Sequence, residues 1–253
     1  MNDRVALAAE PLIELTKVGV CYWVRRGYLK REPIWALRNV SLTLRRGQSL
    51  GVIGRNGAGK TTLLQLMAGI IEPDRGSMIN HGYQASVLSL QVGFLPYLTG
   101  RENAYLSGML LGLDKAEIGA RMDDIVNFSE LGDFIDRPIY TYSSGMTARL
   151  GFSVAFQMDP DILLIDEVLG VGDAAFREKS AAVLREKLLS DKTIVLVSHN
   201  AASIKDLCDQ AVWIEHGVTQ AEGSAEEVVA RYVAFTQMLR KDKARAEAEL
   251  IRK

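Results

Sequence analysis

Glycine, lysine and threonine residues suited to phosphate binding lie in one short stretch, residues 54–62, with the spacing G-x-x-x-x-G-K-[ST]. A phosphate group needs several hydrogen-bond donors at once, and glycines let successive backbone N–H groups point toward one anion. We expect Lys60 to reach the β- and γ-phosphates and the Thr61 hydroxyl to bind Mg²⁺. The stretch therefore predicts a binding site for a nucleoside triphosphate. Its expected contact residues are Gly54, Asn56, Gly57, Ala58, Gly59, Lys60, Thr61 and Thr62.

Two acidic residues, Asp166 and Glu167, directly follow the apolar run 162–165. Such a run is typical of a strand covered on both faces of a parallel sheet, and ligands of open α/β sheets bind at the carboxyl ends of the strands. Phosphoryl transfer to water needs a carboxylate that holds Mg²⁺ and a group that orients the attacking water. The alternative is that the two acidic residues simply face solvent at the end of a strand, which is common. Because a phosphate-binding stretch lies upstream, we assign the metal to Asp166 and the water to Glu167.

A second candidate anion contact is the run Tyr-Ser-Ser-Gly-Met at residues 142–146. Ser143 is predicted to cap a helix that extends to about residue 157. Small residues leave the N–H groups at such a helix start open to an anion. Capped helix starts are common, so this run alone is a weak signal. It indicates a function because it lies just upstream of the apolar strand that ends in Asp166 and Glu167.

The elements that must position these residues are also predicted by the sequence. An apolar run at 49–53 indicates a strand before the phosphate-binding stretch, and residues 62–68 indicate the helix behind it. Helical patterns fill residues 88–157, and we expect an inserted helical subdomain there. Capping boxes are predicted at Thr99 and Asp114. Further strands are predicted at 162–165, 193–197 and 211–215, with helices at 174–190, 201–208 and from 224 into the C-terminal segment.

Length and composition agree with one α/β domain. The 253 residues are 48% hydrophobic with a net charge of −1, so the chain can bury a core and has no overall attraction to nucleic acid, and we expect no nucleic-acid partner. Only Cys21 and Cys208 occur, far apart, which indicates reduced thiols rather than a disulfide framework. No run approaches the roughly 18–20 apolar residues that a membrane-spanning helix needs. We therefore expect any membrane role to depend on a partner that spans the bilayer.

Five motifs in a fixed order carry a resemblance to a known family. Residues 54–62, 142–146 and 162–167, with Asp173 and His199, resemble the Walker A, signature, Walker B, D-loop and switch-histidine motifs of ABC-type ATPases. The resemblance implies an α/β P-loop NTPase (RecA-like) core with an N-terminal antiparallel β region, spanning residues 1–253 as one nucleotide-binding domain. It also implies ATP and Mg²⁺ as ligands and His199 near the γ-phosphate.

The same resemblance implies a dimer of two copies of the chain. In the family, ATP lies between the phosphate-binding loop of one chain and the signature of the other. The signature residues Ser143, Ser144 and Gly145, with Asp173, would then serve the partner's nucleotide.

Departures from the common motifs narrow the resemblance. Ser144 and Met146 replace the more usual Gly and Gln, and Glu167 is followed by Val-Leu-Gly-Val-Gly-Asp. These features are similar to ATPase subunits that export capsular polysaccharide, O-antigen or teichoic acid, in the short form without a C-terminal carbohydrate-binding domain. The resemblance implies an ATPase at the cytoplasmic face of the bacterial inner membrane that drives an integral-membrane permease. Alternatives are another exported substrate, a non-transport ABC ATPase, or a non-hydrolysing scaffold.

Two further roles follow from the resemblance and remain open between alternatives. Gln91 lies twelve residues before Asn103, close to the place of the glutamine that contacts Mg²⁺ in the family, and its alternative is a surface glutamine. Tyr22 stands where the family stacks an aromatic ring on adenine. Trp23 and Trp35 compete with it for that role.

A basic segment, residues 24–33, separates the two β segments predicted at 12–22 and 35–44. We interpret it as a loop because it contains Gly27 and Pro33. One hypothesis is a solvated hairpin that keeps the sheet edge soluble. The other is contact with anionic lipid or with the anionic lipid end of an exported glycan. The residues proposed for this contact are Arg25, Arg26, Lys30 and Arg31.

Overall fold

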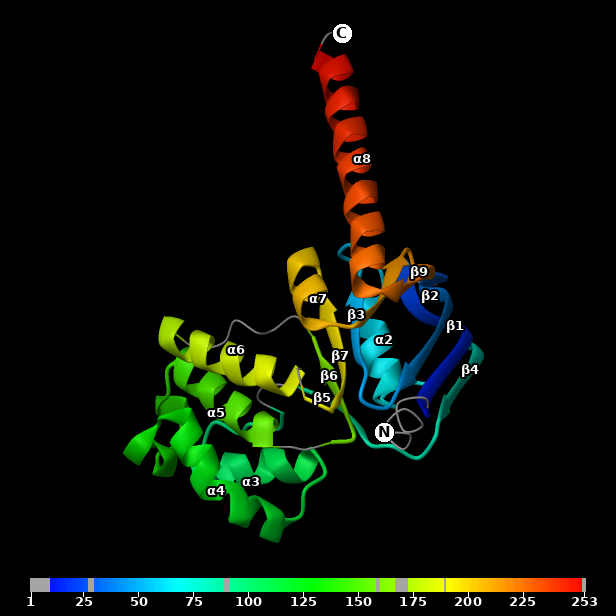
Figure 1. Ribbon diagram of the computed structural model, residues 1–253. Coiled ribbons are helices and arrows are strands. Elements are labelled where there is room, and N and C mark those ends of the chain that lie inside the picture. The colour runs from blue at the N-terminus through cyan, green and yellow to red at the C-terminus, as the bar shows by residue number, and fades with distance from the viewer. Residues whose placement is uncertain are drawn as a thin grey trace. The chain divides into compact units, whose positions relative to one another are not determined.

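The computed structural model describes residues 10–26, 30–88, 92–157, 160–166, 173–188 and 190–251 (Figure 1). The side chains of Lys30, Leu188 and residues 240–251 lie outside this description. The contacts divide the chain into two units, one formed by residues 1–83 and 191–253 and the other by residues 84–190. The expected helical subdomain, residues 88–157, falls within the second unit.

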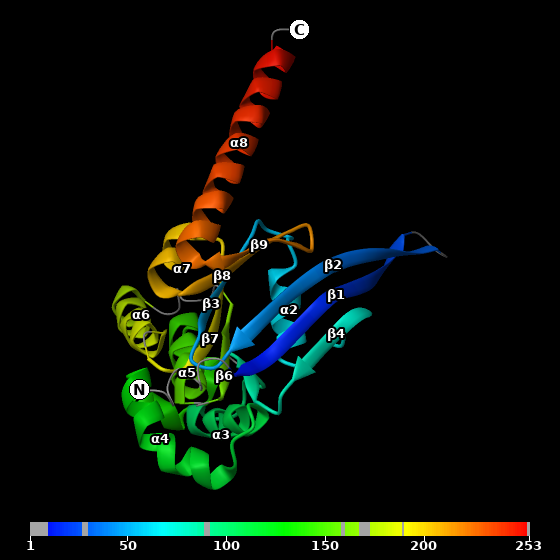
Figure 2. The ribbon, with the colours of Figure 1, turned by 45° about the vertical axis from the view of Figure 1, so that its right-hand side comes forward.

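A long antiparallel hairpin opens the first unit. Strands β1 (Pro11–Arg26) and β2 (Lys30–Arg45) pair along their whole length, and β4 (Arg75–Asn80) pairs with β1 (Figure 2). The prediction of a loop over residues 24–33 was wrong for its described part, because the ladder continues to the pair Arg26↔Lys30. Proline fits here because the contact of β2 with β9 is at Asn39, away from Pro33, and an edge tolerates a missing N–H.

Parallel strands form the buried centre of the first unit. Strand β3 (Ser49–Ile53) lies between β7 (Thr193–Ser198) and β8 (Gln210–Glu215), parallel to both, and every residue of β3 and β7 is buried. Burial on both faces explains why these segments are apolar without alternation. The three parallel strands end at one edge of the sheet. This edge is where ligands of such sheets bind.

Strand β9 (Val218–Ser224), which the sequence analysis missed, pairs antiparallel with β8. The connecting turn is His216-Gly217, and both residues have positive φ, 50° and 74°. That conformation is typical of two-residue hairpin turns.

The helices of the first unit are α2 (Lys60–Met67), α7 (Ala201–Leu207) and α8 (Ala225–Ile251). The start of α8 packs on β8, with the rings of Tyr232 and Phe235 centred 5.8 and 4.9 Å from that of Trp213. None of the helices among the described residues is long and apolar enough to span a membrane.

The second unit combines a short parallel strand pair with helices. Its elements are β5 (Ala85–Val87), α3 (Gly100–Leu110), α4 (Lys115–Ser129), the 3₁₀ turns η1 (Gly132–Asp136) and η2 (Ile139–Thr141), α5 (Ser144–Gln157), β6 (Ile162–Ile165) and α6 (Ala174–Leu188). The capping boxes predicted at Thr99 and Asp114 are confirmed, with Glu102 and Glu117 as the reciprocal partners.

One buried polar side chain organises the loop before α3. Asn103 is fully buried, and its Oδ1 accepts a hydrogen bond from the Leu95 backbone N–H at 2.7 Å. Its Nδ2 donates toward the carbonyls of Leu95, Leu98 and Thr99 at 2.9–3.1 Å. Buried backbone groups need hydrogen-bond partners. In this loop the Asn103 amide supplies the partners that a helix or a sheet would otherwise provide.

We predict that Asn103→Ala destabilises the chain by about 1–3 kcal/mol, because it leaves buried backbone groups without partners. Urea unfolding followed by circular dichroism measures the change. Asn127→Ala is the matched control, since Asn127 lies on α4 of the same unit and is exposed. The control should shift stability by no more than about 0.5 kcal/mol. Equal effects of the two substitutions would contradict the role given to Asn103.

Candidate nucleotide-binding site

The loop between β3 and α2 has a backbone that only glycine permits at several positions. Gly57 and Gly59 have φ of 79° and 104°. A Cβ on Gly59 would lie 2.5 Å from the Ala36 carbonyl oxygen, and one on Gly54 would lie 2.2 Å from that of Ile214. The loop is therefore pressed against β2 and β8 in a form that side chains would prevent.

Lys60 is held inside this loop. It is 8% exposed, and its Nζ donates to the carbonyls of Gly54 at 2.9 Å and Arg55 at 3.1 Å. A buried ammonium beside open backbone suits an anion with several oxygens. The glycine-shaped loop and this lysine fit the polyphosphate of ATP. Thr61, exposed, and Thr62, half-buried, follow on the first turn of α2.

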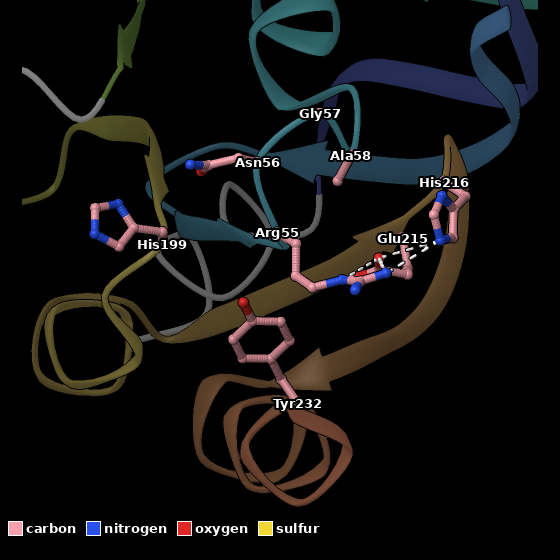
Figure 3. A pocket seen from close by; sticks show the side chains of 8 residues that line it. All are labelled: Arg55, Asn56, Gly57, Ala58, His199, Glu215, His216 and Tyr232. Carbon is pink, nitrogen blue, oxygen red and sulfur yellow. Dashed lines mark hydrogen bonds and ion pairs between the residues drawn. The ribbon is translucent and has the colours of Figure 1, made fainter. Parts of the chain in front are cut away.

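A cavity of about 510 Å³ lies beside the loop (Figure 3). It is formed within the first unit by the β3–α2 loop, the end of β7, the β8–β9 turn and α8. The lining residues are Arg55, Asn56, Gly57, Ala58, His199, Glu215, His216 and Tyr232.

Arg55 is anchored away from the helix start by residues that the sequence analysis missed. Figure 3 shows its side chain directed toward Glu215 and His216. Its Nε donates to Glu215 Oε1 at 2.6 Å, and its Nη2 lies 3.1 Å from His216 Nε2. The hydrogen bond to Glu215 raises the pKa of Arg55 further above its usual value. The Glu215 side chain is 7% exposed, whereas that of Arg55 is 41% exposed, so the carboxylate is the buried member of the pair.

The signal that would have found Glu215 is its place at the carboxyl end of an apolar strand, the rule already used for Asp166. Its second oxygen, Oε2, has no hydrogen-bond partner among the residues that the structure describes. Arg55 carries no such signal, because its partner lies 160 residues away in the chain.

His199 directly follows β7 and lines the same cavity. Hydrogen bonds of the next residue, Asn200, fix the backbone that follows His199. Asn200 N–H donates to Ser198 Oγ at 3.0 Å, and Asn200 Oδ1 accepts from Ala202 N–H at the start of α7. The structure therefore brings His199 and the phosphate-binding loop together.

Of the three aromatic residues considered for adenine, Tyr22 faces α2. Its hydroxyl lies 3.4 Å from Gln65 Oε1 on that helix. Cross-strand partners share a face of the sheet. Tyr22 pairs with Ile34, whereas Trp23 and Trp35 pair with the neighbouring residues Pro33 and Cys21 and so lie on the opposite face.

The second unit holds the signature residues at an open helix start. Ser143 Oγ accepts a hydrogen bond from Met146 N–H at 3.2 Å, so the predicted cap is confirmed. Ser143 and Ser144 are exposed, and a Cβ on Gly145 would meet only Ser143 Oγ, at 3.7 Å. Tyr142 anchors the run through its hydroxyl to the Phe134 carbonyl, and burial raises its pKa to about 12.

The same unit holds Asp166 and Asp173. Asp166 directly follows β6, as the sequence predicted. Asp173 caps α6, since its Oδ1 accepts from Phe176 N–H at 2.9 Å. Two predicted residues, Glu167 and Gln91, lie outside the described residues.

Comparison with known proteins identifies the family. The family model described as ABC transporter matches residues 37–170. The O-antigen export system ATP-binding protein RfbB of Klebsiella pneumoniae is 50% identical over 81% of this chain and 83% of that protein. The teichoic acids export ATP-binding protein TagH of Lactococcus lactis is 46% identical over 83% of this chain, which spans 45% of TagH.

The fold is also found among solved structures. The dimeric ATP-binding cassette MJ0796 bound to ADP and Pi has a TM-score of 0.68 at 21% identity, covering 84% of this chain and 98% of the cassette. The predicted fold class is thereby confirmed. With the phosphate-binding loop, the family match and the relatives taken together, the chain belongs to the ABC transporter family as an ATP-binding subunit, an ATPase similar to those of O-antigen and teichoic acid export systems.

Proposed function

We propose that the chain dimerises and hydrolyses ATP to drive a membrane permease that exports a lipid-linked polysaccharide of the capsule or O-antigen type. The observation that carries the substrate class is the 50% identity to an O-antigen export protein over 83% of that protein. The chain would act peripherally at the cytoplasmic face of the bacterial inner membrane, through its permease. Deleting the gene should abolish surface polysaccharide, and a normal surface glycan after deletion would contradict the proposed export role.

The catalytic roles follow from position and chemistry. Lys60 binds the β- and γ-phosphates, and Glu167 orients the attacking water and draws its proton. His199, at the end of β7, contacts the γ-phosphate. Thr61 and Asp166 are the proposed Mg²⁺ ligands, because hydroxyl and carboxylate oxygens suit that ion. When bound, Mg²⁺ neutralises phosphate charge.

Two finer assignments complete the proposed site. Tyr22 stacks on adenine, supported by its place on the sheet face that contacts α2. Gln91 is a proposed third Mg²⁺ ligand on the family resemblance alone.

We predict that Glu167→Gln lowers steady-state ATP turnover by about 10²–10⁴-fold while ATP binding persists, because an amide cannot accept the proton. Lys60→Ala instead weakens nucleotide binding about 10- to 100-fold, since hydrogen bonds to charged groups are worth about 1.5–3 kcal/mol. Phosphate release and titration with a fluorescent nucleotide separate the two effects.

Lys205→Ala is the control for Lys60→Ala, because Lys205 pairs with Glu226 on the surface. It should bind nucleotide as the wild-type chain does. Wild-type turnover by Glu167→Gln in the presence of the permease would show that the base is another residue.

The open helix start at Ser143 and Gly145 supports a two-chain site, in which the signature of one copy serves the nucleotide on the other. The anion at this helix start would be a phosphate group of the nucleotide that the partner's phosphate-binding loop holds. The MJ0796 cassette, which shares the fold, is dimeric.

A mixing experiment tests the two-chain site. Lys60→Ala has an intact signature, and Ser143→Arg has an intact phosphate-binding loop. We predict that each variant alone is nearly inactive and that a mixture regains turnover. In a dimer of the two variants, one of the two nucleotide sites combines an intact phosphate-binding loop with an intact signature. The wild-type rate per chain should also rise with protein concentration. A constant rate from a strictly monomeric species would refute the proposal.

Exposed aromatic side chains on the second unit supply a surface for the permease. Tyr97 is 85% exposed and Tyr140 65%, with ring centroids 6.3 Å apart. Tyr140 N–H donates to the Pro96 carbonyl, and Asn103 holds the adjoining loop, so these rings stand on fixed backbone. Exposed apolar groups on a firm base are typical of protein interfaces.

The end of the β1–β2 hairpin supports the proposed contact with an anionic lipid group. Arg25 lies opposite Arg31 in the ladder, and Arg26 lies opposite Lys30. Like charges opposite each other destabilise a ladder, and within the hairpin Glu32 offsets this only for Arg26, with which it pairs at 3.2 Å, as far as the described side chains show. Trp23, 65% exposed, adds an amphipathic ring of the type found at lipid interfaces.

We predict that replacing Arg25, Arg26, Lys30 and Arg31 by Ser reduces polysaccharide export in cells at equal protein level. Binding to vesicles that contain anionic lipid should fall as well, since each cation near such a surface contributes about 1 kcal/mol. The control replaces Arg185 and Arg231, which are exposed on α6 and α8, by Ser. Normal export by the hairpin variant would contradict the lipid contact and would show that the hairpin is only a solvated edge of the sheet.

A further inference from the structure

Arg149, on the signature helix α5, contacts acidic groups from two other elements of the second unit. Its Nη2 forms an ion pair with Asp173 Oδ2 at the start of α6, and its Nη1 lies 3.6 Å from Glu130 Oε2 at the end of α4. Its Cζ lies 5.3 Å from the ring centroid of Phe176. The side chain is only 19% exposed, although it carries a full charge. The planar guanidinium therefore joins α5 to α6 by a charge contact and a ring contact.

Asp173 uses both carboxylate oxygens in this arrangement. Oδ1 accepts from Phe176 N–H at 2.9 Å and Oδ2 accepts from Arg149. The hydrogen bond from Phe176 and then the one from Arg149 lower the pKa of Asp173, so it stays ionised. One residue thus both begins α6 and links it to α5.

The surroundings hold Arg149 in place. Glu130, in the left-handed conformation at φ 55°, also accepts from Lys179 Nζ at 2.7 Å, and that Nζ donates to the Phe128 carbonyl at 3.0 Å. Below the ion pairs, four aromatic rings pack with centroids 5.7–5.9 Å apart. They belong to Phe128, Phe152, Phe156 and Phe176.

We propose that Arg149 is a positioning residue for ATP hydrolysis, which holds Asp173 and the signature at a fixed separation so that both meet the partner chain as one surface. The inference rests on the proposed roles of the signature and of Asp173. A stabilising role alone is a poor explanation, because Asp173 is 56% exposed and ion pairs with such a partner add little to stability. Arg149 links α5 to the start of α6, and the starts of both helices face a partner chain in the proposed dimer. A positioning role there accounts for an arginine that is largely buried despite its charge.

The first test is Arg149→Gln in the full-length chain. Turnover should fall about 10- to 100-fold, the effect of small misplacements in an active site. Binding of a fluorescent nucleotide to the phosphate-binding loop should stay unchanged, because Lys60 and its loop lie in the other unit. Arg149→Lys should recover part of the loss, since it keeps the charge without the planar fork.

Arg101→Gln is the matched control. Arg101 lies in the same unit and pairs with Asp136 through two hydrogen bonds of 2.7 and 3.1 Å, neither of which involves α5 or α6. The control should turn over ATP as the wild-type chain does, with a similar shift in the unfolding midpoint to Arg149→Gln.

A double-mutant cycle with Asp173→Asn separates positioning from stability. Asparagine retains an oxygen that can cap α6 and loses the ion pair. If Arg149 acts through Asp173, turnover by the double variant should equal that of the worse single variant. Wild-type turnover by Arg149→Gln, or losses that multiply in the double variant, would overturn the inference. Full activity of Ser143→Arg would instead overturn the two-chain site, which distinguishes the two failures.

Discussion

The close approach of backbone segments around the phosphate-binding loop is the constraint on which the first unit depends. Cβ atoms on Gly59 and Gly217 would lie 2.5 and 2.6 Å from the same carbonyl oxygen, that of Ala36 on β2. Gly217 N–H in turn donates to the Ala58 carbonyl at 3.0 Å. Three segments, from β2, the loop and the β8–β9 turn, therefore meet at one point. Any side chain there would push the loop off its path, so the donors that face a phosphate are set by packing before a ligand arrives.

Charge is distributed around this point in a complementary way. Lys60 lies buried in the loop, and its Nζ donates to the carbonyls of Gly54 and Arg55. The guanidinium of Arg55, one residue beyond Gly54, is neutralised by Glu215 and rests 5.8 Å from the Phe235 ring on α8. Arg55 thus fastens the loop to β8 and α8. Because a buried carboxylate without a partner is costly, the Arg55–Glu215 pair also holds the β8–β9 turn near the loop.

The candidate site residues Ser143 and Asp173 of the second unit lie at capped helix starts, whereas those of the first unit lie on a glycine-rich loop. Thr99, Asp114, Ser143 and Asp173 each accept a hydrogen bond from a backbone N–H in the first turn of a helix. At Ser143 the capped start is lined by the small residues Ser144, which is exposed, and Gly145, which leaves room for an incoming anion. At Asp173 the cap is shared with Arg149, so a local device for starting a helix becomes a contact between helices. The proposed division of labour between the two units follows from this difference.

The sequence by itself determined the features that depend on near neighbours. The glycine spacing of residues 54–62, the capping boxes and the continuous apolar strands are local patterns, and each was predicted with the right element type. Motif order along the chain also indicated the family, because these motifs serve one reaction and so occur together. An error arose where local signals competed: Pro33 suggested a loop, but it lies within the ladder of β1 and β2, at a place where β2 pairs with β1 alone.

Tertiary structure alone decided the contacts between distant residues. Arg55 and Glu215 are 160 residues apart, and no spacing rule joins them. That Tyr22 lies on the opposite face of the hairpin from Trp23 and Trp35 needed the register of the ladder, since a shift of one residue exchanges the two faces of a strand. The link from Arg149 to Asp173 required α5 and α6 to pack on a shared layer of phenylalanines. Such contacts arise from packing, in which each partner's place is set by the whole fold and not by its sequence neighbours.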